Sequence, residues 1–217
     1  MTNINRKLTP YNYTPHVNKR NMWIVIHYVG AVSTARNNAD YFYTAKRGAS
    51  AHYFVDEKEI WQVVDDENDA WHVGGASKYY NSCRNNNSIG IELCCKKNDR
   101  GEWYFEKETV QNAIELTAML MKRWKIPMER LTTHHGVTGK ICPEPFVRNP
   151  EQWTEFRKKV GEILMEDTER ELTIQEKCKV IQDYYGFDEN TTLYFQMYRY
   201  NYALIDKLYY KAKNDEK

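Results

Sequence analysis

The sequence lacks an excess of charge of either sign. Its 31 lysine and arginine residues are balanced by 30 aspartate and glutamate residues, which leaves a formal net charge of +1. A chain without a positive field does not recruit a polyanion over distance, so we expect no nucleic acid among its partners. Its 41% hydrophobic content is enough for a core at a length of 217 residues, which excludes disorder throughout the chain.

Long apolar runs are also missing. Stretches such as residues 23–26 and 118–121 are far shorter than the ~20 residues that cross a bilayer, so we expect no membrane insertion. The N-terminal segment has Arg6 and Lys7 but no apolar core or small-residue cleavage site after them, unlike a Sec signal peptide. The sequence therefore predicts synthesis in the cytoplasm without a Sec signal.

Paired cysteine motifs are absent as well. The five cysteines are irregularly spaced and form no CxxC pair, in a chain too long to depend on crosslinks, so we expect no disulfide framework. The adjacent Cys94 and Cys95 are interpreted as strand residues that point to opposite faces of a sheet. Cys142 is the cysteine nearest to a pair of histidines in the sequence.

Apolar periodicity predicts strands and helices in alternation over the first 160 residues. In the strand expected over 88–95, Ile89, Ile91 and Leu93 share one face and Glu92 points to the other. Further strands are expected over 22–28, 51–55 and 59–64, and helices over 34–46, 107–124 and 153–165. This order predicts an α/β fold, in which a mixed central β-sheet is flanked by helices.

The composition changes at Glu166. The last 52 residues contain eight of the 17 tyrosines and more acidic than basic side chains. Helical patterns over 173–185, 191–200 and 201–211 predict a small all-helical C-terminal module. We therefore expect two domains, residues 1–165 and residues 170–217, joined by a short linker.

Two distant stretches contain the side chains best suited to bind a transition metal. His27 ends the first long strand, and His134 and His135 precede Cys142. A hydrolytic zinc site needs three protein ligands and one open position, and imidazole and thiolate groups suit Zn²⁺. The interval from His134 to Cys142 is not that of a zinc finger, so spacing alone leaves open a structural role for these residues. For His16, His52 and His72 a structural role is the default expectation.

Five short motifs, taken together and in order, carry a family resemblance. They are IVIHY at 24–28, SAHYFVD at 50–56, AWHVGG at 70–75, NNSIGIEL at 86–93 and THHGVTGKICP at 133–143. In this order and at these intervals they resemble the zinc-dependent N-acetylmuramoyl-L-alanine amidase family, the type 2 amidases, which includes phage amidases and peptidoglycan recognition proteins. The resemblance covers roughly residues 20–160.

The resemblance implies a role for each matching residue. His27, His134 and Cys142 match the metal ligands, which leaves His135 outside the ligand set. Lys140 matches a catalytic lysine of the family, and Glu92 matches its catalytic acid. Some phage members carry a catalytic tyrosine just before the histidine of the second motif. This chain has Ala51 there, so we expect Glu92 to take that role.

The activity that the resemblance implies is zinc-dependent hydrolysis of the amide bond between N-acetylmuramic acid and L-alanine in peptidoglycan. Trp71, His72 and Gly74 are expected to line the substrate groove, because an indole can stack on a sugar and glycine permits close approach of the backbone. A cytoplasmic chain with this activity is typical of a phage or prophage endolysin that reaches the cell wall after release or lysis.

Other functions are considered as alternatives. The first is a non-catalytic peptidoglycan-binding protein of the same fold; such proteins lack the third metal ligand, which Cys142 supplies here. A metallopeptidase that cuts within the stem peptide is less consistent with the sequence, which has no HExxH motif. The sequence is silent on a regulatory, protein-binding role. The tyrosine-rich module is interpreted as cell-wall binding, the alternative being a helical core or a dimer surface.

Overall fold

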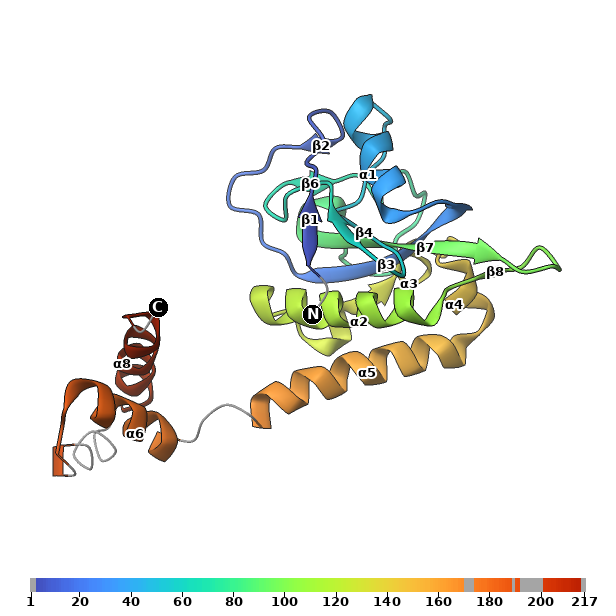
Figure 1. The fold of residues 1–217 in the computed structure, drawn as a ribbon. Helices are drawn as coiled ribbons and strands as arrows, with labels where there is room; N and C mark the ends of the chain where they lie inside the picture. The colour runs from blue at the N-terminus through green and yellow to red at the C-terminus, as the bar shows by residue number, and fades with distance from the viewer. Residues whose placement is uncertain (1–2, 170–173, 189, 192–200, 216–217) are drawn as a thin grey trace. The chain divides into compact units, whose positions relative to one another are not determined.

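The computed structural model describes residues 3–169, 174–188, 190–191 and 201–215. The chain divides into two compact units, Met1–Leu164 and Met165–Lys217, and the first contains every residue of the expected site (Figure 1). No helix in the described part of the chain is both long and apolar enough to span a membrane.

A mixed β-sheet forms the centre of the first unit. Its strand order is β1-β5-β4-β7-β3-β9, and β8 extends the edge of β7. The strands are β1 (Ile4–Arg6), β3 (Trp23–Val32), β4 (Tyr53–Val55), β5 (Ile60–Gln62), β7 (Ser88–Lys97), β8 (Trp103–Tyr104) and β9 (Leu131–Thr133). The neighbours β4 and β5 are antiparallel, as β7 and β8 are, and the other pairs are parallel. The predicted mixed sheet is confirmed, and β2 (Tyr13–Thr14) and β6 (Asp69–Ala70) form a separate antiparallel pair.

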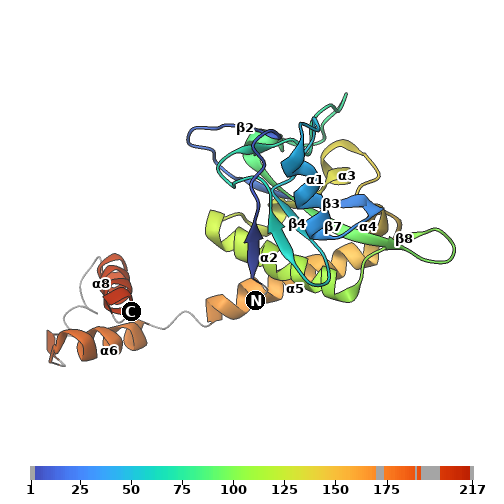
Figure 2. The same cartoon turned by 45° about the horizontal axis from the view of Figure 1, so that its top comes forward.

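Helices cover both faces of this sheet. They are α1 (Ala35–Thr44), α2 (Lys107–Trp124), α3 (His134–Thr138), α4 (Glu144–Arg148) and α5 (Pro150–Glu169). Figures 1 and 2 show α2 and α5 on one side of the sheet and α1 on the other. The predicted helix 107–124 is confirmed at both ends, and Lys125 terminates it in a left-handed conformation, with φ 53°. The helix predicted over 153–165 is longer at both ends, beginning at Pro150 and ending at Glu169.

Successive side chains along β3 and β7 point to opposite faces of the sheet, and the two faces pack against different clusters. Ile24 and Ile26 of β3 belong to the main core, together with Ile89 and Ile91 of β7 and residues of α2 and α5. Val25, between them, belongs to a different cluster with Val73, Cys83 and Val137. His27 follows the parity of Val25, and Glu92 the opposite parity to Ile91, so both lie on the face away from α2 and α5.

A groove on the outer side of the main core runs along α2 and α5. It has a volume of about 960 Å³, and its walls combine Phe105, Ile114, Phe146 and Phe156 with charged side chains of both helices. This groove belongs to the packing face of the sheet and contains none of the expected site residues.

The second unit contains the helices α6 (Ile174–Tyr185) and α8 (Asn201–Asp215). Cys178, Ile181 and Ile205 are buried between them, with Tyr185 and Tyr209 partly buried against this cluster. The predicted helices 173–185 and 201–211 are thus confirmed. The helix predicted over 191–200 lies outside the described residues, apart from its first residue.

Candidate metal centre

His27 and His134 are brought together by the pairing of two parallel strands. In the register of β3 and β9, Ile26 is opposite Thr133. The residues that follow are His27, still in β3, and His134, the first residue of α3, and this pairing places them side by side. The two imidazole rings contact each other edge to face, with centroids 4.8 Å apart. Thr133 begins α3 as its N-cap, accepting a hydrogen bond from the Gly136 amide at 3.1 Å, and this turn fixes the direction of His134.

Cys142 reaches the same point from the segment between α3 and α4. Its carbonyl accepts a hydrogen bond from the His135 amide at 2.8 Å, which ties the segment to α3. The Sγ atom of Cys142 lies 3.6 Å from Nδ1 of His27. One ligand atom from each of His27, His134 and Cys142 lies within 4.8 Å of the other two, and all three residues are buried.

The chemistry of these three side chains fits a divalent cation such as zinc. Burial lowers the pKa of His27 well below its usual value and that of His134 to about 4, so both imidazoles are neutral and have a lone pair to donate. Burial and, to a lesser extent, the charge of Glu92 raise the pKa of the Cys142 thiol to about 12. Cys142 forms no disulfide. Two neutral imidazoles and one sulfur are a ligand set typical of catalytic zinc, with the fourth position left to water or substrate.

Glu92 lies beside this cluster in the neighbouring strand. It is the register partner of His27 in the parallel pair β3 and β7. Its Oε2 atom is buried and has no hydrogen-bond partner among the described residues. Burial raises the pKa of the carboxyl to about 8, and the positive charge of Lys140 opposes this shift. A buried acid with a pKa near neutrality next to candidate metal ligands has the properties of a proton carrier.

Lys140 is exposed at the rim of the same cluster. It lines a cavity of about 510 Å³ together with His134 and Thr138 on one side and the segment Gly74–Ser77 on the other. After burial, its positive charge also lowers the pKa of His27 and of His134. Of the five predicted residues, His134 and Lys140 line this cavity. His27 and Cys142 are buried next to His134, and Glu92 is paired with His27 in the neighbouring strand.

Of the three residues predicted to line the substrate groove, Trp71 and Gly74 line cavities and His72 does not. Gly74 lines the 510 Å³ cavity and also an adjoining cavity of about 330 Å³ that Trp71 lines. The indole Nε1 of Trp71 donates a hydrogen bond to Thr14 Oγ1 at 2.9 Å, which holds its ring in place.

His72 does not lie where the sequence suggested. It is only 8% exposed and lines neither cavity. Its Nδ1 atom is 3.0 Å from His27 Nε2, and its Nε2 atom is 3.1 Å from Ser88 Oγ. Both ring nitrogens are therefore engaged inside the protein, and the prediction that His72 lines the groove is corrected. The motif AWHVGG at 70–75 places His72 among apolar residues, which is consistent with a buried histidine. It gives no indication that the partner of His72 is His27.

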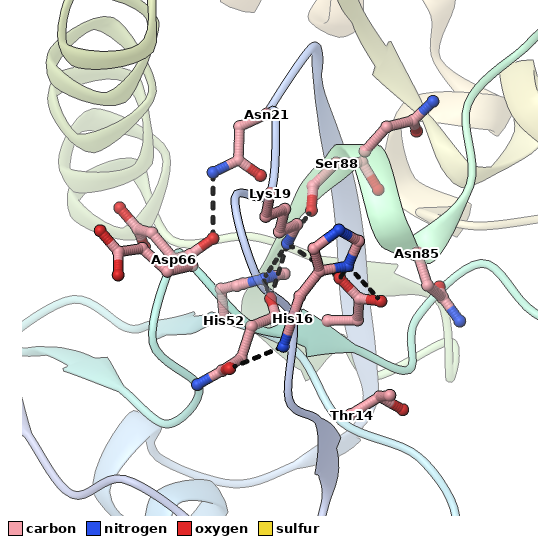
Figure 3. A network of polar contacts seen from close by, with 12 residues as sticks. Thr14, His16, Lys19, Asn21, His52, Asp66, Asn85 and Ser88 are labelled. Atoms are coloured by element: carbon pink, nitrogen blue, oxygen red, sulfur yellow. Dashed lines mark hydrogen bonds and ion pairs between the residues drawn. The ribbon is translucent and has the colours of Figure 1, made fainter.

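A second buried network lies behind His72 and was missed by the sequence analysis. Lys19, whose side chain is fully buried, contacts His52 Nε2 at 3.0 Å and donates hydrogen bonds to the carbonyls of Asn68 and Ser88 at 2.6 and 3.0 Å (Figure 3). Burial lowers the pKa of Lys19 to about 8, and the charge of Asp69 opposes this shift. No pattern around Lys19 distinguishes it from a surface lysine.

Tyr53 lies away from the cluster. Its hydroxyl donates a hydrogen bond to Asp66 Oδ1 at 2.6 Å, and the ring belongs to the main core on the opposite face of the sheet. Ala51, at the position of the family tyrosine, is fully buried in the cluster under α1. Neither residue adds a polar group to the centre.

His27 and Glu92 lie on one face of the mixed sheet, and His134 of α3 and Cys142 of the following segment join them there. Two imidazoles and a thiol beside a carboxyl are the arrangement of a hydrolytic metal site. The family model described as N-acetylmuramoyl-L-alanine amidase matches residues 18–145. The match extends over more than half of the sequence and includes all five residues of the cluster, and the chain belongs to this family.

Curated relatives and solved structures agree with this assignment. The chain is 38% identical over 151 residues to the N-acetylmuramoyl-L-alanine amidase CwlL of Bacillus licheniformis, a match that covers 65% of this chain and 41% of CwlL. It is 30% identical over 168 residues to XlyA of Bacillus subtilis (strain 168), covering 74% of this chain and 52% of XlyA. The chain thus spans about two fifths to one half of these relatives.

Among solved structures, PlyL superposes with a TM-score of 0.61 at 26% identity, covering 73% of this chain and 97% of PlyL. A mutant endolysin from Bacillus subtilis superposes equally well, with a TM-score of 0.61 at 28% identity, covering 74% of this chain and 99% of that structure. The match therefore includes nearly all of each of these two solved chains.

Proposed function

We propose that this chain hydrolyses the amide bond between N-acetylmuramic acid and L-alanine in peptidoglycan, with a zinc ion held by His27, His134 and Cys142. The observation that carries the proposal is the convergence of three ligand atoms from distant segments to within 4.8 Å of one another. Membership of the amidase family supports the choice of bond and substrate.

Of the three ligands, His134 lines the 510 Å³ cavity, and His27 and Cys142 are buried beside it. His27 would use Nδ1, because its Nε2 atom is directed at His72, and Cys142 would use Sγ. Zinc, when bound, polarises the carbonyl of the scissile amide and lowers the pKa of water to about 7. The deeply buried position of all three ligands excludes bulk solvent from the side away from the cavity.

Glu92 would carry the proton. Its buried carboxyl lies on the same face as the ligands, has an oxygen without a partner among the described residues, and has a pKa of about 8. As the carboxylate it would accept a proton from the attacking water, and as the resulting acid it would return that proton to the nitrogen of the leaving L-alanine. Transfer by a positioned group of this kind contributes ~10²- to 10⁴-fold to the rate.

Lys140 would stabilise the negative charge that develops on the carbonyl oxygen. Its ammonium group is exposed at the cavity and close enough to the ligands to affect their pKa values. Loss of one such donor typically costs about 10² to 10³ in rate.

The substrate would enter over the segment Gly74–Ser77. This segment and the turn at Thr138–Lys140 form the two sides of the 510 Å³ cavity, and the adjoining 330 Å³ cavity beside Trp71 offers an aromatic surface for a sugar ring. Gly75 has a φ of +75°, a conformation that glycine adopts without strain and that lets the backbone approach a ligand closely.

We further propose a lytic role on the bacterial cell wall. One of the solved structures that this fold resembles is described as an endolysin from Bacillus subtilis. The second unit would hold the enzyme on the insoluble wall. Some of its aromatic side chains, such as Tyr184 and Tyr210, are exposed and could contact the wall.

The test is digestion of purified peptidoglycan by the zinc-loaded chain, followed by mass spectrometry of the products. The expected products are stem peptides with a free L-alanine amino group and glycan strands that keep the lactyl carboxyl. Cys142→Ser and a chelator-treated sample are the controls. Binding to walls without products would favour the non-catalytic alternative, and cleavage within the stem peptide would identify a peptidase instead.

A further inference from the structure

A chain of hydrogen bonds leads from the protein backbone to the metal-facing side of His27. Ser88 Oγ lies 2.6 Å from the carbonyl oxygen of Arg84 and 3.1 Å from His72 Nε2. His72 Nδ1 lies 3.0 Å from His27 Nε2, and His27 Nδ1 lies 3.6 Å from Cys142 Sγ. Every link except the last therefore joins a donor and an acceptor at ordinary hydrogen-bond distance.

The first link sets the direction of all the others. A carbonyl oxygen can only accept, so the single hydroxyl proton of Ser88 points to Arg84. Ser88 Oγ must then accept from His72, which places the proton of the neutral His72 ring on Nε2. His72 Nδ1 is left as an acceptor, and His27 donates to it from Nε2. The Nδ1 atom of His27 is consequently unprotonated and faces Cys142.

The position of the His72 ring is fixed independently of these bonds. Asn85 Oδ1 accepts hydrogen bonds from the backbone amides of His72 and Val73, at 3.1 and 2.9 Å. A Cβ atom at Gly90 would lie 2.7 Å from the Cγ and Nδ1 atoms of His72, so the ring occupies space that only glycine leaves free. The ring therefore packs directly against the backbone of β7 at Gly90.

Ser88 is anchored as firmly as His72. Ser88 is fully buried, and its backbone carbonyl accepts a hydrogen bond from Lys19 Nζ at 3.0 Å (Figure 3). Lys19 itself is held by the Asn68 carbonyl at 2.6 Å. The acceptor for His72 thus belongs to a rigid part of the molecule.

From this geometry we propose that His72 and Ser88 are positioning residues, which hold His27 in the tautomer and ring orientation that a metal-binding Nδ1 requires. The inference rests on the proposed ligand set but concerns residues that touch neither metal nor substrate. A metal-binding histidine commonly donates its second N–H to a partner that sets its tautomer, and loss of such a partner typically costs 10- to 100-fold in metal affinity.

The tautomers of the full-length chain can be measured directly without metal. In ¹⁵N-labelled protein, long-range ¹⁵N–¹H correlations of the imidazole rings report which nitrogen is protonated. We expect His27 and His72 both to carry the proton on Nε2 in the zinc-free protein, and His72 to keep it there after zinc is added. A proton on Nδ1 of His72 would overturn the proposal.

Zinc affinity, measured by competition with a chelator, is the second test. We expect Ser88→Ala to weaken zinc binding roughly 10- to 100-fold. Ser50→Ala is the matched control, because Ser50 is also buried and bonded, to the Trp71 amide at 2.8 Å, but contacts no histidine. Equal effects of the two variants, or unchanged affinity in Ser88→Ala, would contradict the proposal.

Substitutions of His72 complete the test. Asparagine places its Oδ1 atom near the position of His72 Nδ1 and can accept from His27, whereas phenylalanine fills the space without an acceptor. We expect His72→Asn to bind zinc more tightly than His72→Phe, and the reverse order would refute the role. If the unmodified chain fails to bind zinc, the proposed function fails, while the tautomers of the metal-free protein still decide this inference.

Discussion

His27 Nδ1 and Cys142 Sγ lie 3.6 Å apart, although 115 positions separate the two residues in the chain. One comes from the central strand β3 and the other from the segment before α4. Their approach depends on the pairing of β3 with β9, which also places His134. A cation bound by these three residues would therefore connect parts of the chain that are joined only through the tertiary fold.

Metal binding is expected to stabilise the protein. A ligand that binds only the folded state at 1,000 times its Kd adds about 4 kcal/mol to the free energy of unfolding. Thermal melting with zinc should thus occur well above melting with a chelator, and Cys142→Ser should lose most of the difference. Cys178→Ser, which changes a buried cysteine in the core of the second unit, should keep it. An equal zinc effect in Cys142→Ser and the unmodified chain would contradict the ligand assignment.

Glu92→Gln should separate metal binding from turnover. The amide keeps the size of the carboxyl but cannot accept a proton, so we expect bound zinc to be unchanged and the rate of wall hydrolysis to fall ~10²- to 10⁴-fold. Elemental analysis and a peptidoglycan digestion assay measure the two quantities. Glu57→Gln, which removes an acid paired with Lys96 at the surface, serves as the control. Retained hydrolysis in Glu92→Gln would remove Glu92 from the mechanism.

The same carboxyl predicts a pH dependence of stability in the metal-free protein. Its pKa rises from an ordinary value of 4.5 in the unfolded chain to about 8 in the folded one. Between these values the folded state holds a proton that the unfolded state has released, so the free energy of unfolding falls as the pH rises. The slope contributed by one group is at most about 1.4 kcal/mol per pH unit. Urea denaturation at pH 5, 6.5 and 8 should therefore show a smaller decline in Glu92→Gln, and parallel curves would show that the carboxyl is not shifted.

Removal of residues 170–217 tests the role of the second unit. The first unit has its own core and all residues of the candidate site, so hydrolysis of a soluble muropeptide should be unchanged. Co-sedimentation with purified cell walls should decrease, because the truncated enzyme would lose its second attachment point. If sedimentation is the same for both lengths, the unit has another role, such as a dimer contact.

Strong periodic patterns made much of the fold predictable. The helix 107–124 was predicted to the residue, because its apolar positions recur without interruption over five turns. The alternation in 88–95 correctly assigned Glu92 to the face opposite Ile89 and Ile91. Helix and strand periodicity depend on residues that are close together in the sequence. A single sequence contains this local information in full.

The remainder depends on contacts between distant segments. Strand β9 has three residues, too few for a pattern, yet its pairing with β3 places His134. The partner of His72 could not be predicted either, because hydrogen bonds between rings 45 residues apart leave no local pattern. The candidate metal ligands were predicted through the resemblance of five motifs, while their spacing alone was not decisive.

The division of the sheet into two faces separates the chemistry from most of the apolar packing. Ile24 and Ile26 point to α2 and α5, whereas His27 and Glu92 point the other way. Engineers seeking a longer-lived enzyme for storage at elevated temperature can therefore direct a mutant library at the 960 Å³ groove along those helices. Larger side chains there would fill empty space and leave the reacting groups undisturbed.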